Sequence, residues 1–264
     1  MATLVFVHAH PDDEASQTSG TMARAVAAGD RVVCVYATNG DHGSAPDDLG
    51  DHALADRRRA EAEASAEAVG THRIVWLGHR DSGMHGWLTN TAEGALWVAD
   101  ADAVARQVAD VLDDEDADAV IGYDWHGGYG HPDHLMVHRV ARHAVELAAR
   151  RPRYLEVSLN RDLLRRLMTV AREQGLLPEE GTWDVDAPAD DGNPIGTPEA
   201  ELHWAVDVTG QLDVKRAALA CHASQEDAAQ LLSMPPEAFA AMMGTEHFLE
   251  PGRAPGLVTG WPFA

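Results

Sequence analysis

Two short polar segments contain the residues best suited to chemistry, HPDDE at residues 10–14 and HPDH at residues 131–134. Each segment follows a predicted strand and opens a predicted helix. Residues three apart on a first helical turn lie on one side, so His10 and Asp13 can converge on one point. His134 can reach the same point from its own helix. The spacing therefore predicts a shared site built from two distant parts of the chain.

The residue types in these segments favour a metal site. Two imidazoles and one carboxylate, from His10, Asp13 and His134, form a set typical of catalytic zinc with an open position for water. Bound zinc lowers the pKa of a water ligand to about 7. Asp12 adjoins a ligand and is the candidate general base. The same set suits iron or manganese, so Zn²⁺ is predicted with Fe²⁺ as the alternative.

A simpler interpretation exists for each segment taken alone. A carboxylate at a helix start is usually a cap, and Asp12 fits that role. HPDH alone is also more often a helix start than a site. Two His-Pro-Asp segments, both at strand-to-helix turns, are hard to explain by capping alone, and their joint occurrence favours the metal site.

Apolar runs alternate with helical patterns along the chain. This alternation predicts an α/β fold, Rossmann-like, with a mainly parallel sheet flanked by helices. Ligands of such sheets bind at the carboxyl ends of the strands, where both polar segments lie. The expected strands are 3–7, 31–37, 73–77, 117–123, 154–159 and 202–208, and the expected helices are 14–28, 53–69, 100–112, 132–150, 161–174, 212–222 and 226–243.

The sequence predicts a single domain spanning residues 1–264. Residues 176–201 contain four prolines and eight acidic residues, which predicts a long loop flanking the substrate. The tail from Gly244 is rich in glycine and proline, which predicts a segment that wraps the surface.

The composition limits the partners. The 20 basic and 43 acidic residues give a net charge of −23, which disfavours nucleic acid and anionic membrane surfaces. The sequence contains no CxxC pair, so it offers neither a zinc-finger site nor a dithiol redox site. The sequence shows no signal-peptide pattern, so we expect a cytoplasmic protein. The expected partner is a small-molecule substrate, and a homo-oligomer is compatible with the sequence.

Residues 7–14 (VHAHPDDE) together with residues 130–134 (GHPDH) resemble the LmbE-like, or PIG-L, deacetylase family. The resemblance extends over nearly the whole chain. It implies zinc-dependent removal of N-acetyl groups from glucosamine-containing substrates, with His10, Asp13 and His134 as metal ligands. In this resemblance Asp12 matches the general base.

The resemblance also implies roles for residues near the second segment. His131 matches the residue that stabilises the oxyanion or protonates the leaving amine. Asp133 matches the carboxylate that orients His131. Tyr129 matches a mobile tyrosine that helps to polarise the substrate carbonyl.

Further segments resemble the mycothiol branch of the family, which contains a deacetylase and an S-conjugate amidase. Arg58 and the Asp81 of RDSGM (residues 80–84) match substrate-binding positions there. Asp41, where the family often has glutamate, and Gln17, where the amidase has lysine, depart from the pattern. The substrate therefore stays open among an N-acyl amino sugar, a thiol-conjugate amide and a specialised-metabolite amide.

Three other kinds of function fit the sequence less well. A nucleotide-binding module would need a GxGxxG turn, which VHAHPDDE lacks. A binding protein that has lost catalysis is disfavoured, because all the proposed ligands and the base are present. A two-metal phosphoesterase would use Arg58 to grip phosphate but needs more ligands than the sequence offers.

Overall fold

The computed structural model describes residues 1–44, 51–175, 184–189 and 191–263. Within them the strands form one sheet in the order β3-β2-β1-β4-β5-β7-β6-β8. The strands are β1 (Thr3–His8), β2 (Arg31–Thr38), β3 (Arg73–His79), β4 (Ala119–Tyr123), β5 (Arg153–Ser158), β6 (Trp204–Asp207), β7 (Thr245–Leu249) and β8 (Val258–Thr259). Neighbours from β3 to β5 are parallel, whereas β7 pairs antiparallel with β5 and β6. The predicted mainly parallel α/β fold is confirmed.

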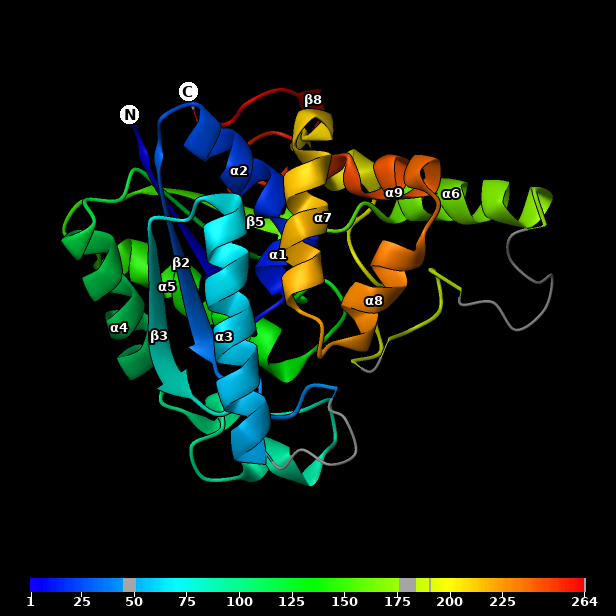
Figure 1. Cartoon of the computed structure of the whole chain (residues 1–264). Coiled ribbons are helices and arrows are strands. Elements are labelled where there is room, and N and C mark those ends of the chain that lie inside the picture. The colour runs from blue at the N-terminus through cyan, green and yellow to red at the C-terminus, as the bar shows by residue number, and fades with distance from the viewer. Residues whose placement is uncertain (45–50, 176–183, 190, 264) are drawn as a thin grey trace.

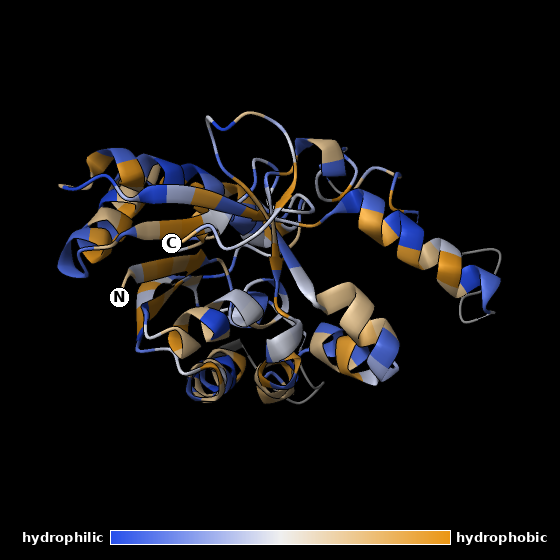
Figure 2. Cartoon of the chain, turned by 90° about the horizontal axis from the view of Figure 1, so that it is seen from above, coloured by the Kyte–Doolittle hydropathy of each residue, from blue (hydrophilic) through white to orange (hydrophobic). Residues whose placement is uncertain are grey.

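Helices cover both faces of the sheet, with α2, α3 and α7 on one face and α4 and α5 on the other (Figures 1 and 2). The helices are α1 (Asp13–Gln17), α2 (Ser19–Ala27), α3 (Asp51–Val69), α4 (Ala101–Asp114), α5 (Pro132–Leu147), α6 (Arg161–Glu173), α7 (Leu212–Cys221), α8 (Glu226–Ser233) and α9 (Pro236–Met243). Short 3₁₀ turns occupy Leu88–Thr91, Leu96–Val98, Glu199–Glu201 and Thr209–Gln211. The core lies between the layers and is centred on the fully buried side chains of β1, β2 and β4.

Two predicted helices are each divided in two. The helix predicted over residues 14–28 breaks at Thr18, whose hydroxyl lies 2.9 Å from His8 Nε2. The Glu246 carboxylate accepts hydrogen bonds from the amides of Gly20 and Thr21, so it caps the new helix start. The helix predicted over residues 226–243 breaks at Met234 because two prolines follow it.

The prediction for the tail was wrong in one important respect. Residues 245–249 form β7, a buried strand between β5 and β6, instead of a surface wrap. The strand has only five residues and includes Glu246 and His247, so it lacks the apolar run by which a buried strand is predicted. Its register places His247 opposite Ser158 at the carboxyl end of β5.

Among the described residues, none of the helices has the length and apolar character that a membrane crossing requires. The predicted loop at 176–201 falls partly outside the described residues, which omit 176–183 and 190. Its described part lies against the loop that follows β4, because the Gly196 amide donates to the Gly128 carbonyl at 2.6 Å.

Candidate active site

The turn after β1 has a strained backbone. Asp12 has φ 105° and ψ −27°, a region that residues with a Cβ rarely occupy. Its amide donates to the Glu14 carboxylate at 3.0 Å, and the buried Arg58 guanidinium donates to the carbonyls of Pro11 and Gly40. These contacts hold the strained turn, which directs the carboxylates of Asp12 and Asp13 to different sides.

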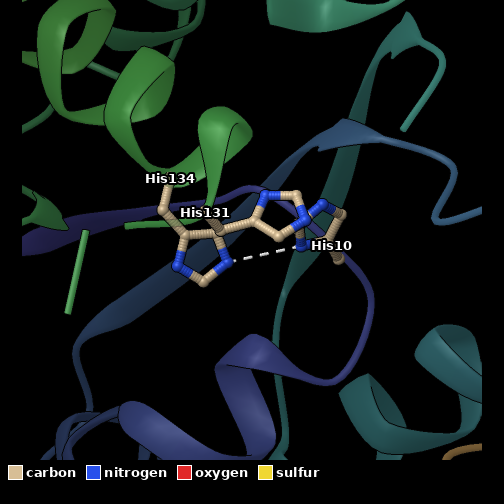
Figure 3. Close-up of side chains that lie close together, drawn as sticks. All are labelled: His10, His131 and His134. Carbon is tan, nitrogen blue, oxygen red and sulfur yellow. Dashed lines mark hydrogen bonds between the residues drawn. The ribbon is translucent and has the colours of Figure 1, made fainter. Parts of the chain in front are cut away.

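Three predicted metal ligands converge at the carboxyl ends of β1 and β4. His10 Nδ1 and His134 Nε2 lie 3.3 Å apart, as the dashed line in Figure 3 shows. One oxygen of Asp13 lies 3.4 Å from His10 Nδ1, and the other lies 3.4 Å from His134 Nε2. Tetrahedral zinc with bonds of about 2.0–2.1 Å separates its ligand atoms by about 3.3–3.4 Å. The separation of the two imidazole nitrogens therefore matches two ligands of one tetrahedral ion, and Asp13 places one carboxylate oxygen beside each of them.

The outer nitrogens of both imidazoles also have the partners that metal ligands use. His10 Nε2 lies 3.1 Å from the Asp133 carboxylate, and His134 Nδ1 lies 3.0 Å from the Gly127 carbonyl. A metal-binding histidine commonly donates its second N–H to a carboxylate or carbonyl, which fixes the ring and its tautomer. In the neutral rings the inner nitrogens are then the unprotonated ones, which can bind a cation.

The carboxylates around His10 also favour a bound cation. Burial alone would lower the pKa of His10, but the carboxylates of Asp81, Asp13 and Asp133 raise it well above its ordinary value. Such a cluster of carboxylates in a buried site needs a positive charge, which either a proton or a metal ion can supply.

His131 offers a further nitrogen close to the same cluster (Figure 3). Ligand atoms of His10, His131 and His134 lie within 4.8 Å of one another, as do those of His10, Asp81, His131 and Asp133. We favour the set with Asp13, because it uses the inner nitrogens of both histidines and leaves His10 Nε2 to Asp133.

The side chain of His131 is held by the start of α5, where its Nδ1 accepts a hydrogen bond from the Asp133 amide at 3.1 Å. The proton of the neutral ring therefore sits on Nε2. Burial, with His10 and His134 nearby, lowers the pKa of His131 well below its ordinary value. This geometry favours a neutral N–H donor.

The predicted role of Asp133 needs correction. Its carboxylate accepts hydrogen bonds from the amide and the hydroxyl of Ser82, at 2.8 and 2.5 Å, and faces His10. The contact with His131 comes from the Asp133 backbone instead. The Asp133 carboxylate thus contacts His10, a proposed metal ligand, while His131 caps the helix start by accepting from the Asp133 amide.

Asp133→Asn is expected to weaken zinc binding about 10–100-fold, because His10 loses its charged acceptor. Competition with a chromogenic chelator measures the dissociation constant. Asp110→Asn, on the exposed surface of α4, is the matched control and should bind zinc like the unmodified protein. Equal zinc affinity in all three proteins would show that Asp133 does not support the metal site.

Tyr129 lies in the glycine-rich loop between β4 and α5. Its ring centroid is 4.9 Å from that of His134 and 6.1 Å from that of His131, and the side chain is partly exposed. Burial and the nearby Asp13 raise the pKa of Tyr129 well above its ordinary value, so its hydroxyl stays protonated. Tyr129 can donate a hydrogen bond toward the metal site.

Asp12 lies beside the ligands and outside their triangle. Its side chain is 25% exposed, and its Oδ1 lies 3.2 Å from Arg58 Nη2. Burial raises the pKa of Asp12 to about 6, although Arg58 counteracts this rise. A carboxylate with this pKa is charged at neutral pH and can still accept a proton, as a general base must.

The two predicted substrate-binding residues make hydrogen bonds and ion pairs with other residues of the protein. Arg58 is buried against Asp12 and two backbone carbonyls. Asp81 accepts from the Gly83 amide at 2.7 Å and lies 3.5 Å from His10 Nε2. A substrate contact by either residue stays a prediction, and both also support catalytic groups.

A buried network behind Asp12 was missed by sequence reasoning. Glu14 accepts from Ser65 at 2.6 Å and lies 2.7 Å from His222 Nε2 at the end of α7. Burial would raise the pKa of Glu14, but His222 and Ser65 lower it to about 2. The sequence signal was the glutamate after Asp12-Asp13, whereas His222 resembled an ordinary core residue.

Asp124 is a second residue that was missed. It follows β4 directly, is fully buried and accepts from the amides of His126 and Gly128 at 3.1 and 2.9 Å. These bonds shape the loop that carries Tyr129 and the Gly127 carbonyl. A carboxylate directly after a buried strand was the available signal.

A mainly parallel α/β sheet with His10, Asp13 and His134 clustered at its carboxyl edge, and a further carboxylate beside them, is an arrangement typical of metal-dependent hydrolases. Residues 5–145 match the family model PIG-L, GlcNAc-PI de-N-acetylase. The chain belongs to this family.

The relatives agree on the chemistry. The chain is 35% identical over 244 residues to a 1D-myo-inositol 2-acetamido-2-deoxy-alpha-D-glucopyranoside deacetylase of Thermobifida fusca, covering 84% of this chain and 82% of the relative. It is 33% identical over 269 residues to the same kind of deacetylase from Salinispora arenicola, covering 93% and 83%.

Solved structures show the same fold. An N,N'-diacetylchitobiose deacetylase from Pyrococcus horikoshii matches with a TM-score of 0.60 and 22% identity, covering 94% of this chain and 82% of that one. A 4-carboxy-2-hydroxymuconate hydratase from Pseudomonas putida also matches, with a TM-score of 0.60 and 18% identity over 96% and 98% of the two chains. The fold therefore hosts more than one reaction, and function must be argued from the site.

Proposed function

We propose that this protein is a zinc-dependent deacetylase that hydrolyses the acetamide of an N-acetylglucosaminyl substrate. The observation that carries the proposal is the convergence of His10, Asp13 and His134, whose facing atoms lie 3.3–3.4 Å apart, with the Asp12 carboxylate next to them in the same turn. Relatives that span most of the chain are named as deacetylases of an N-acetylglucosaminyl inositol, which supports this class of substrate.

The residues divide the work of hydrolysis. A bound zinc ion would supply Lewis-acid polarisation of the carbonyl and of the attacking water. Asp12 accepts a proton from that water while the water oxygen forms a bond to the acyl carbon. Tyr129 donates a hydrogen bond to the carbonyl oxygen as negative charge develops on it. The C–N bond then breaks, and the amine leaves with a proton.

The proton for the leaving amine can come from two groups. The resemblance allows His131 either to stabilise the oxyanion or to protonate the amine. Because its pKa is lowered and its Nδ1 accepts a backbone hydrogen bond, the neutral Nε2–H donor role is better supported. Asp12, protonated by the water, then returns its proton to the amine nitrogen.

Metal analysis combined with amine release tests the function. The panel contains N-acetylglucosaminyl-inositol, N,N'-diacetylchitobiose and an S-conjugated cysteinyl-glucosaminyl inositol. We expect amine release from N-acetylglucosaminyl-inositol, one zinc per chain, loss of activity with a chelator and recovery with zinc. Faster cleavage of the S-conjugate would instead indicate an amidase. Full activity in metal-free protein, or no cleavage of any amide, would contradict the proposal.

A further inference from the structure

A cavity lies at the carboxyl end of β5, one strand beyond β4 and on the same edge of the sheet as the proposed metal site. Its walls come from α1, β5, α6, α9 and β7, which are distant in sequence. Ligands of parallel sheets bind at this edge, so a cavity here is well placed to extend the active site.

One contact joins the cavity to a proposed metal ligand, and another joins it to the loop that carries Tyr129. Gln17 lines the cavity, and its amide donates to Oδ1 of the metal ligand Asp13 at 3.2 Å. On the other side Ser158 lines the cavity and donates to Asp124, which shapes the loop bearing Tyr129. At Gln17 the cavity is therefore one side chain away from the proposed ligand cluster.

The lining of the cavity is mainly apolar. Leu159, Leu163 and Leu164 form one wall, and Met242 and Met243 form another. Methionine side chains adapt their shape to different apolar groups. This lining would accept an aliphatic or thioether group.

The polar groups of the cavity are already paired. Lys215 is buried in an ion pair with Glu246, which also accepts from the amides of Gly20 and Thr21. Asn160 donates to Glu199 at 2.9 Å and accepts from the Leu163 amide at 3.0 Å. A charged or sugar-like group would find few free partners here.

We infer that this cavity binds an apolar substituent of the substrate, beyond the acetamide-bearing sugar. This inference rests on the proposed function and deepens it. The substituent is a short alkyl or thioalkyl group, carried either on the acyl side or on the amine side of the scissile bond.

Two ligand series distinguish these sides. Linear acyl hydroxamates of two to eight carbons extend the acyl side of zinc-loaded protein. Alkyl N-acetylglucosaminides, from methyl to hexyl, extend the amine side and need no metal to bind. Calorimetry measures the dissociation constants, and cleavage of the glucosaminides is followed in parallel. In one series we expect about fourfold tighter binding per methylene until the cavity is full.

Variants of the cavity provide the decisive comparison. Leu163→Trp should fill the cavity and remove the gain in affinity with chain length in the series that shows it. Met243→Ala should enlarge the cavity and shift the tightest binding to longer chains. Val170→Trp is the matched control, because Val170 lies on α6 but is 46% exposed and does not line the cavity. Thermal melting checks that each variant is folded.

Two results would overturn the inference: affinity independent of chain length in both series, or equal effects of Leu163→Trp and Val170→Trp. Absence of hydrolysis would count against the proposed function alone, since binding of the glucosaminides still tests the cavity. Hydrolysis of the methyl glucosaminide, combined with affinities that do not change with chain length in either series, would count against the cavity alone and leave the proposed function standing.

Discussion

Asp12→Asn is expected to lower kcat by about two to four orders of magnitude while the protein keeps one zinc per chain. Asparagine preserves the size of the side chain but cannot accept the proton of the attacking water. The ligand triangle does not include Asp12, so its geometry should persist. Elemental analysis and steady-state kinetics on the same preparation measure both quantities.

Asp13→Asn is the matched variant one residue away. It removes the charge of a ligand whose oxygens lie 3.4 Å from both His10 and His134, so zinc content should fall along with activity. If Asp12→Asn lost zinc and Asp13→Asn kept it, the roles of the two carboxylates would be reversed. Full activity in Asp12→Asn would place the base elsewhere.

The pH profile provides a further readout of Asp12. A general base works only when deprotonated, so kcat/KM should rise as pH increases through the pKa of Asp12 and then level off. Burial sets that pKa at about 6 in the metal-free protein, and a nearby cation shifts it downward. The acidic limb should therefore lie at or below pH 6. The residual activity of Asp12→Asn should lack this limb.

His134→Ala is expected to abolish stoichiometric zinc and activity together. His134 is fully buried, and its Nε2 is one corner of the ligand triangle. The remaining His10 and Asp13 cannot hold a tetrahedral ion tightly, since structural and catalytic zinc sites use at least three protein ligands. Zinc content is measured by elemental analysis after dialysis, and kcat with saturating substrate.

His138→Ala is the control for this variant. His138 lies one turn further along α5, is partly buried and contacts the Tyr123 carbonyl at 3.0 Å, so it tests the loss of an imidazole from the same helix. It should retain zinc and activity. One tightly bound metal per chain in His134→Ala would show that the ligand assignment is wrong.

The central strands and the strand-to-helix turns could be predicted because their signals are local. Apolar runs at β1, β2 and β4 end in polar segments, which places His10 and His134 at one edge of the sheet. Strand β7 could not be predicted in this way, because its burial depends on partners from β5 and β6. Sequence pattern cannot reveal such partners when a strand contains charged residues.

Pairings within the site were the least predictable part. Only the packed structure decides that the Asp133 carboxylate contacts Ser82 and His10. The positive φ of Asp12 is equally hidden, since glycine is the residue normally expected there. Glu14 and His222 are 208 residues apart, and no local pattern links them.

These distant contacts also affect how the chain matures during synthesis. The N-terminal turn carries two of the three proposed ligands, yet His222 secures Glu14, and Glu246 caps the start of α2. A nascent chain emerges from the ribosome N-terminus first, and contacts of high sequence separation form late in folding. The turn that bears His10 and Asp13 is therefore completed only after β7 has been translated. Metal binding at this turn should consequently follow translation of β7.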